Sequence, residues 1–367
     1  MTSLGVTLHG VRLNLHSAHA PLVDYARDHL GGRAVEGAAA GRGSACELAA
    51  APFADADLEV RCLWSEGARD DEANPFAADD PDGQALERIG KRMLGNADTL
   101  VWLDPQRMLG LKLRVRRRGG WRFDVAYRYH PGEKHRHELR EYEYKKYFSL
   151  MSYLVYYPLF WHLERTRGFT LVHAAALGTG MGAVMVGGLG GVGKTTLSMA
   201  LSRQPGFTLG AENLSLTDGT AVLPCHEPIR LDPRSLELLG PMPGLTPMRF
   251  PAGLKEKHMF HVRPAMADPP WAPRALYLPH FSARRVTRLS PAEAAERFLA
   301  MNRLTLEVDD YVWFASALDL HWPSPGLTAR RTSAVEALTR RAACFLLGVD
   351  PTAGVGAAVA DVLGSLD

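Results

Sequence analysis

Hydrophobic and polar positions alternate most regularly between residues 111 and 129. Apolar side chains occupy every second position on both sides of the pair Gly119-Gly120. A period of two is typical of half-buried β-strands, and two glycines between such runs favour a tight turn. The pattern therefore predicts a β-hairpin with one apolar face, and a second face that carries basic side chains: Lys112, Arg114, Arg116, Arg118 and Arg122.

Two interpretations of this basic face are open at the level of sequence. The first is an ordinary solvated sheet face. The second is a docking surface for an acidic partner peptide, because clustered like charge raises the local potential and speeds encounter.

Other periodic segments predict a strand over Val6–Leu15 and a helix over Pro21–Leu30, which Gly31-Gly32 would end. Residues 138–167 predict one or two helices, kinked or broken at Pro158 because proline lacks a backbone N–H. The apolar run inside this segment spans about 13 residues, fewer than the roughly 20 that a bilayer requires. We therefore expect a buried helix and no membrane partner.

The most specific motif is the run Gly188-Leu-Gly-Gly-Val-Gly-Lys-Thr195, which matches the pattern G-x-x-x-x-G-K-[ST]. It directly follows the apolar strand 183–186 and precedes a segment with a helical apolar face, so the required strand, loop and helix context is present. Glycines let the backbone curl until its N–H groups and the helix N-terminus converge on phosphate oxygens. The residues expected to hold a nucleotide are Gly188, Gly190, Gly191, Val192, Gly193, Lys194, Thr195 and Thr196.

Two side chains of this motif have distinct expected roles. Lys194 should bridge the β- and γ-phosphates, and the Thr195 hydroxyl should bind Mg²⁺. ATP and Mg²⁺ are therefore the predicted cofactors.

Length and charge restrict the other possibilities. A chain of 367 residues predicts two domains or one large one, and we place the boundary between 137 and 138. The formal net charge of +2 gives no reason to expect nucleic acid as a partner. The four cysteines are far apart with no CxxC pair, which fits a reducing compartment, and no secretory signal is apparent, so we expect a cytoplasmic protein.

Three stretches together resemble the HPr kinase/phosphorylase family and its HprK-related members. These are Leu171–Ala176, the phosphate loop, and Gly206–Asn213. In that family a histidine stands about 21 positions before the loop lysine, as His173 stands to Lys194. The resemblance covers roughly residues 155 to 265, and residues 341–363 are similar to the family's C-terminal strand and helix.

The resemblance implies an α/β fold: a P-loop kinase domain of the HPr kinase type, related to phosphoenolpyruvate carboxykinase, over 138–367, and a smaller mixed α+β domain over 1–137. It also implies a homo-oligomer. Two residues depart from the family pattern, since the family's strand ends in Ala-Asp-Asp where this chain has Ala211-Glu212-Asn213.

Carried over residue by residue, the resemblance implies that Glu212 is the general base for an acceptor hydroxyl and that His173 contacts the active-site phosphate. Thr195, Asn213 and Glu227 would hold the metal. A basic segment that contains Lys257 and Arg263 would supply positive charge to the transferring phosphoryl group, where such charge stabilises the transition state. The structural alternatives are a strand-end cap for Glu212-Asn213, a core histidine, and a solvated basic loop.

The function that follows is an ATP-dependent serine kinase that transfers the γ-phosphoryl group to a hydroxyl on a small protein or peptide. Two alternatives stay open: a nucleotide-gated binding protein without turnover, and a kinase of a small metabolite.

Overall fold

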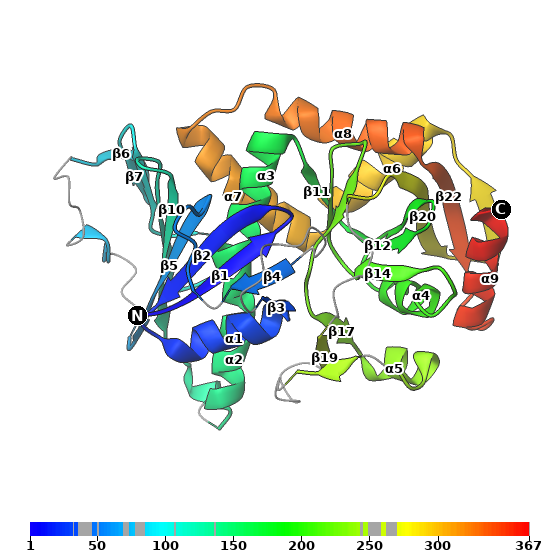
Figure 1. Cartoon of the computed structure of the whole chain (residues 1–367), viewed down its shortest axis with the longest axis horizontal. Helices are drawn as coiled ribbons and strands as arrows, with labels where there is room; N and C mark the ends of the chain where they lie inside the picture. The colour runs from blue at the N-terminus through cyan, green and yellow to red at the C-terminus, as the bar shows by residue number, and fades with distance from the viewer. Residues whose placement is uncertain are drawn as a thin grey trace. The chain divides into compact units, whose positions relative to one another are not determined.

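The computed structural model describes residues 1–31, 33–35, 46–49, 51–68, 73–77, 85–105, 108–135, 137–242, 245–248, 258–261 and 270–366. The chain divides into two compact units, each of which combines helices with sheets, so the mixed α/β class is confirmed (Figure 1). The first unit extends beyond residue 137 to Trp161 and includes Trp313–Pro323, while the second contains His162–Val312 and Ser324–Asp367.

The first unit contains a ten-stranded sheet in the order β3-β4-β1-β2-β5-β10-β9-β8-β7-β6. Its strands are β1 (Thr2–Leu8), β2 (Val11–Ser17), β3 (Arg33–Val35), β4 (Cys46–Ala49), β5 (Leu58–Glu66), β6 (Glu87–Gly90), β7 (Met93–Gly95), β8 (Thr99–Trp102), β9 (Leu111–Arg116) and β10 (Trp121–Tyr129). The single strand predicted over Val6–Leu15 is wrong, because β1 and β2 form a hairpin around His9-Gly10, both at positive φ. The apolar alternation continues across this turn and conceals it.

The helical predictions for this part of the chain are confirmed. Helix α1 (Ala20–Leu30) ends at Gly31, whose φ of 52° is the left-handed conformation that favours glycine. The later segment forms α2 (Leu139–Met151), a π-helical turn η3 (Ser152–Tyr156) and α3 (Tyr157–Arg167), preceded by the short turn η2 (Glu133–His135). The π turn ends two residues before Pro158, which is the second residue of α3 and has no N–H to donate to the helical hydrogen-bond ladder.

The predicted hairpin is confirmed as β9 and β10, but its basic face is only partly solvated, because Arg118 is exposed whereas two other basic residues are not. Lys112 and Arg114 are buried, and they donate hydrogen bonds to the carbonyls of Ala73 and Phe76. The sequence showed which face these residues share, but not the 73–77 segment that they contact. The expectation of an exposed basic docking surface is therefore wrong for these two residues.

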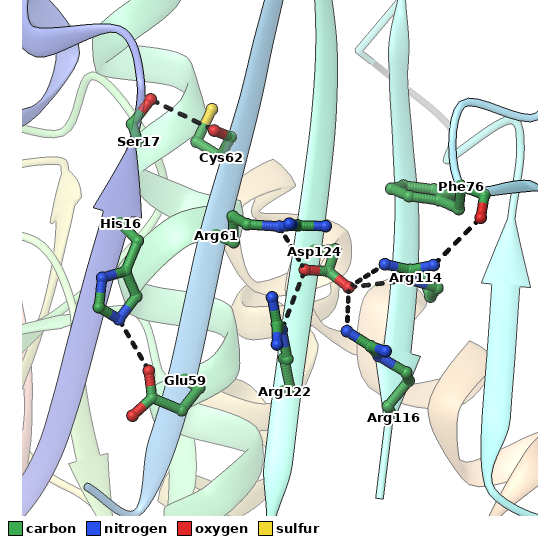
Figure 2. A network of polar contacts seen from close by, with 10 residues as sticks. All are labelled: His16, Ser17, Glu59, Arg61, Cys62, Phe76, Arg114, Arg116, Arg122 and Asp124. Atoms are coloured by element: carbon green, nitrogen blue, oxygen red, sulfur yellow. Dashed lines mark hydrogen bonds and ion pairs between the residues drawn. The ribbon is translucent and has the colours of Figure 1, made fainter. Parts of the chain in front are cut away.

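A single carboxylate organises the basic side chains of this face. Asp124 is fully buried, and it accepts hydrogen bonds from Arg114 at 2.9 Å and Arg116 at 3.2 Å (Figure 2). Two further guanidinium groups, of Arg61 and Arg122, bond its other oxygen at 3.0 and 3.2 Å. The alternating arginines thus serve a buried ion cluster within the sheet.

The second unit is built on a six-stranded sheet in the order β14-β12-β13-β20-β22-β21. These strands are β12 (Ala174–Thr179), β13 (Gly182–Gly187), β14 (Thr208–Ala211), β20 (Pro273–Phe281), β21 (Arg285–Arg288) and β22 (Ala343–Val349). Strands β13, β20 and β22 are parallel, whereas β12 runs antiparallel between β13 and β14. The start of β12 and the ends of β13, β14, β20 and β22 therefore meet at one edge of the sheet.

Helices cover both faces of this sheet, as the period of two along its strands requires. On one face, Ala176 and Met185 pack with Phe298 of α6 (Pro291–Arg303) and Leu338 of α8 (Leu327–Arg341). On the other face, Ala175 and Val184, which neighbour Ala176 and Met185 in the chain, pack with α4 (Lys194–Leu201) and α9 (Val355–Leu366). Figure 1 shows these helices around the sheet. The predicted C-terminal strand and helix are confirmed as β22 and α9.

The described residues of this unit also form two three-stranded sheets and two further helices, and the unit includes the end of α3. The sheets are β11-β15-β16 and β17-β19-β18, formed by β11 (Thr170–Val172), β15 (Ser215–Thr217), β16 (Val222–Pro224), β17 (Ile229–Leu231), β18 (Thr246–Pro247) and β19 (His258–His261). The helices are α5 (Pro233–Leu239) and α7 (Leu306–His321), of which α7 continues into the first unit. Among the described residues, no helix is long and apolar enough to cross a bilayer.

Candidate nucleotide-binding site

The predicted phosphate loop connects β13 to α4, as its sequence context required. Gly191 and Gly193 have φ angles of 86° and 84°, which side-chain-bearing residues rarely adopt. A Cβ at either position would meet nothing within 4 Å, so backbone conformation and not crowding demands glycine there. Positive φ at these two glycines is compatible with a curled loop of the kind that binds anions through its backbone N–H groups.

The loop lines a cavity of about 620 Å³ at the sheet edge where the strand ends meet. This volume falls in the range of small-molecule sites. The cavity lies where ligands bind in open α/β sheets, outside the carboxyl ends of the parallel strands. His173, Glu212 and Asn213 join Lys194 and Thr195 in its lining.

Lys194 is buried although it carries a charge. Its Nζ lies 2.5 Å from Nε2 of His173 and 3.2 Å from Oδ1 of Asn213, and both partners are uncharged acceptors. No carboxylate of the described residues lies within ion-pair distance of this ammonium group. Burial lowers the pKa of Lys194 to about 8, while Glu212 and Glu307 act in the opposite direction. At neutral pH the site therefore contains a protonated, buried cation.

His173 is held at three atoms. Its backbone N–H donates to Oδ1 of Asn302 at 2.7 Å, and its Nδ1 lies 3.0 Å from the Thr305 hydroxyl. That hydroxyl donates to the carbonyl of Met301, so it is left to accept from Nδ1–H. Nε2 is then unprotonated, and it lies beside both Nζ of Lys194 and Oδ1 of Asn213, which is 3.0 Å away. Nε2 and Oδ1 both accept hydrogen bonds from the ammonium group. Burial and the Lys194 charge lower the pKa of His173 to about 4, consistent with a neutral ring.

Glu212 follows β14, and its carboxylate accepts a hydrogen bond from the Thr195 hydroxyl. Glu227, in the segment before β17, has an Oε2 that is buried and has no hydrogen-bond partner among the described residues. Burial raises the pKa of Glu227 to about 7, and Arg230 opposes this shift.

Of the three predicted metal ligands, Thr195 and Asn213 line the cavity, whereas Glu227 is not among its lining residues. Hydroxyl and amide oxygens are hard donors of the kind that hold Mg²⁺ together with substrate phosphates. In the described part of the chain, no group of three or more His, Cys, Asp or Glu residues could hold a metal ion by itself. The phosphates would therefore have to supply part of the coordination.

The structure brings together most of the residues that the sequence singled out. His173, Lys194, Thr195, Glu212 and Asn213 line the same cavity. Thr196 also lines it, although its hydroxyl is 3.1 Å from that of Ser235 in α5. Lys257 and Arg263 lie outside the described residues.

Sequence reasoning missed the residues of the corner between α6 and α7. Asn302 and Thr305 position His173, and the Glu307 carboxylate lies 3.9 Å from the Arg230 guanidinium. No local motif marks these residues, which stand about 130 positions after His173. Only the capping box at Ser290–Glu293, which begins α6, indicates that a helix leads toward this corner.

Comparison with protein-family models and with curated proteins finds no match for this chain.

Proposed function

We propose that this protein is an ATP-dependent kinase that transfers the γ-phosphoryl group of ATP to a serine-like hydroxyl on a small protein or peptide. The HPr kinase-type fold that the sequence resembles is part of this proposal. One observation carries it: a glycine-rich loop, a buried lysine without a carboxylate partner, and a threonine bonded to a carboxylate share one cavity.

The charge of Lys194 is the strongest argument for a phosphate ligand. Burying an ammonium group without an opposite charge costs free energy, and neutral partners such as His173 and Asn213 recover only part of it. A polyphosphate in the cavity would supply the missing negative charge. The loop N–H groups and the start of α4 favour an anion at the same place.

The remaining side chains suit phosphoryl transfer, in which positioning and electrostatics do most of the catalysis. Glu212 would accept the proton of the acceptor hydroxyl. The hydroxyl oxygen would then bond to the γ-phosphorus while the bond to ADP breaks and ADP leaves. His173, neutral with Nε2 directed toward Lys194, would keep that ammonium group positioned. Mg²⁺, when bound, would offset charge on the phosphates, and by resemblance Lys257 and Arg263 would add positive charge.

A nucleotide-gated binding protein without turnover is the second candidate. The contact between Glu212 and Thr195 supports it, because a carboxylate engaged with the metal-side hydroxyl is less available as a base. In addition, Asn213 stands where the resembled family has an aspartate.

Nucleotide binding and turnover should be measured separately. We expect Lys194→Ala to weaken a non-hydrolysable ATP analogue at least 100-fold by calorimetry, whereas Lys91→Ala, at an exposed lysine, should leave the affinity unchanged. With Mg²⁺ and γ-labelled ATP, Glu212→Gln should abolish label transfer to peptides while it retains most of the analogue affinity.

Two results would decide against this assignment. Unchanged analogue affinity in Lys194→Ala would exclude the cavity as the nucleotide site. Tight analogue binding with no label on any hydroxyl acceptor would favour the binding protein instead.

A further inference from the structure

The corner between α6 and α7 displays two leucines at the mouth of the cavity. Thr305 is 6% exposed and bonded to His173, whereas its neighbours Leu304 and Leu306 are 70% and 65% exposed. The hydrogen bonds of Thr305 hold it inward, to His173 on one side and to the carbonyl of Met301 on the other. The two leucines are therefore fixed outward by the same contacts that position the histidine.

Both leucines line the nucleotide cavity, and strand order defines the side on which they lie. His173, at the start of β12, and Glu212-Asn213, after β14, lie on one side of the loop strand β13. The corner is attached to this side through His173 and Asn302. Because the Lys194 ammonium group also contacts His173 and Asn213, this is the side of the terminal phosphate.

The opposite side of the cavity has its own apolar lining. Phe281 ends β20, Val349 ends β22, and Val355 and Ala358 belong to α9. Strands β20 and β22 lie on the other side of β13 from β12 and β14. A nucleoside thus has apolar surface available without Leu304 and Leu306.

From this arrangement we infer that Leu304 and Leu306 form a docking surface for the acceptor, which is a peptide segment with bulky apolar side chains next to its hydroxyl residue. The inference rests on the proposed kinase function and names the substrate class of that site. It favours a peptide over a small polar metabolite, because a polar metabolite would gain nothing from two exposed leucines. An apolar side chain, in contrast, gains affinity in proportion to the area that it buries against them.

Peptide binding should be measured directly, independently of turnover. The probes are two fluorescein-labelled heptapeptides, Gly-Lys-Leu-Ser-Leu-Lys-Gly and Gly-Lys-Asn-Ser-Asn-Lys-Gly, titrated with protein saturated with a non-hydrolysable ATP analogue and Mg²⁺. We expect the leucine peptide to bind at least tenfold more tightly than the asparagine peptide. The double variant Leu304→Asn/Leu306→Asn should remove this difference, whereas Leu109→Asn, a leucine with the same 70% exposure in the first unit, should preserve it.

Three outcomes would overturn the inference. The first is equal or undetectable binding of the two peptides by the unmodified protein. The second is weaker binding of the ATP analogue by the double variant, which would assign the leucines to the nucleoside. The third is a change of molar mass in light scattering, which would assign them to a second copy of the chain. Failure of the kinase proposal is separate, since it would appear as absent label transfer with the peptide preference intact.

Discussion

One buried charged residue in each unit allows a comparison, because the two residues have different kinds of partner. In the first unit, Asp124 is fully buried and is bonded by four guanidinium groups, which belong to Arg61, Arg114, Arg116 and Arg122 (Figure 2). In the second, Lys194 is 6% exposed and contacts only the neutral acceptors His173 and Asn213.

The difference separates a structural charge from a binding charge. The partners of Asp124 come from the chain itself, so its cluster is complete when the protein is folded. No carboxylate of the described residues forms an ion pair with Lys194, although Glu212 and Glu307 act to raise its pKa, and the lysine lines a cavity beside a glycine-rich loop. Under the proposed function, a bound phosphate would complete the compensation of this cation.

The largest expected effect tests whether the buried Asp124 cluster stabilises the fold. Asp124→Asn leaves several guanidinium groups without their buried anion, so the free energy of unfolding should fall by about 3–5 kcal/mol. Urea denaturation measures this loss. Asp98→Asn is the matched control, because Asp98 is 40% exposed where it pairs with Arg117, and it should cost at most about 1 kcal/mol. Equal effects of the two variants would show that the Asp124 cluster is not a structural centre.

For Lys194, we expect a substitution to raise the free energy of unfolding, whereas the substitution of Asp124 lowers it. Lys194→Met removes a buried cation, so the ligand-free protein should become more stable by up to about 3 kcal/mol at pH 7. The pKa of Lys194 is lowered to about 8 from its ordinary 10.5, so the unfolded chain binds more protons between these values. The stability of the unmodified protein should therefore rise with pH across this window relative to the variant.

Urea denaturation at several pH values between 7 and 10.5 provides the measurement. The advantage of Lys194→Met should shrink toward zero at the upper end. A variant that is less stable than the unmodified protein at pH 7 would instead place Lys194 in the same structural category as Asp124.

Glu227 adds a buried anion to the comparison, with an effect of similar size to that of Lys194. Burial raises the pKa of its carboxyl from 4.5 to about 7, so the folded state binds more protons than the unfolded chain between these values. Stability should therefore decrease as pH rises from 4.5 through 7, and Glu227→Gln should remove this decrease. We expect Glu227→Gln to be more stable by up to about 3 kcal/mol above pH 7 and equal below pH 4.5, as measured by urea denaturation. A constant difference at all pH values would show that the carboxyl does not titrate in this range.

The smallest expected effect concerns Thr305. Thr305→Val removes the acceptor of His173 Nδ1–H and should cost about 1 kcal/mol of stability. It should also shift the imidazole ¹⁵N resonances of His173, since the ring loses the bond that selects its tautomer. Thr305→Ser retains the hydroxyl and should restore both values. Unchanged ¹⁵N resonances in the valine variant would contradict the assigned tautomer.

Sequence patterns predicted local structure well where the pattern and the element coincide. The loop Gly188–Thr195, helix α1 and the β9–β10 hairpin follow from residues that are neighbours in the chain. The prediction of a single strand over Val6–Leu15 was wrong, because the apolar alternation continues through a tight turn and so gives no sign of it. The basic hairpin face was misinterpreted because period two shows which residues share a face, but not what that face contacts.

The candidate site divides in the same way. A resemblance to a known family singled out His173, Glu212, Asn213 and Glu227 before the structure placed them, and geometry then put the first three around Lys194 and Thr195. Asn302, Thr305 and Glu307 could not be found, because an asparagine, a threonine and a glutamate in a helical corner carry no chemical signature of their own.

By itself, the sequence determined the glycine-rich loop and the strand and helix that flank it, because glycine conformation, apolar period and helix start are all properties of adjacent residues. Only the tertiary structure decided that Thr305 selects the proton position of His173, that Lys194 has neutral partners, and that Asp124 collects the arginines of three strands. The physical reason is distance along the chain. A hydrogen bond of 3.0 Å between residues 132 positions apart depends on the packing of many intervening elements, and no local pattern encodes it.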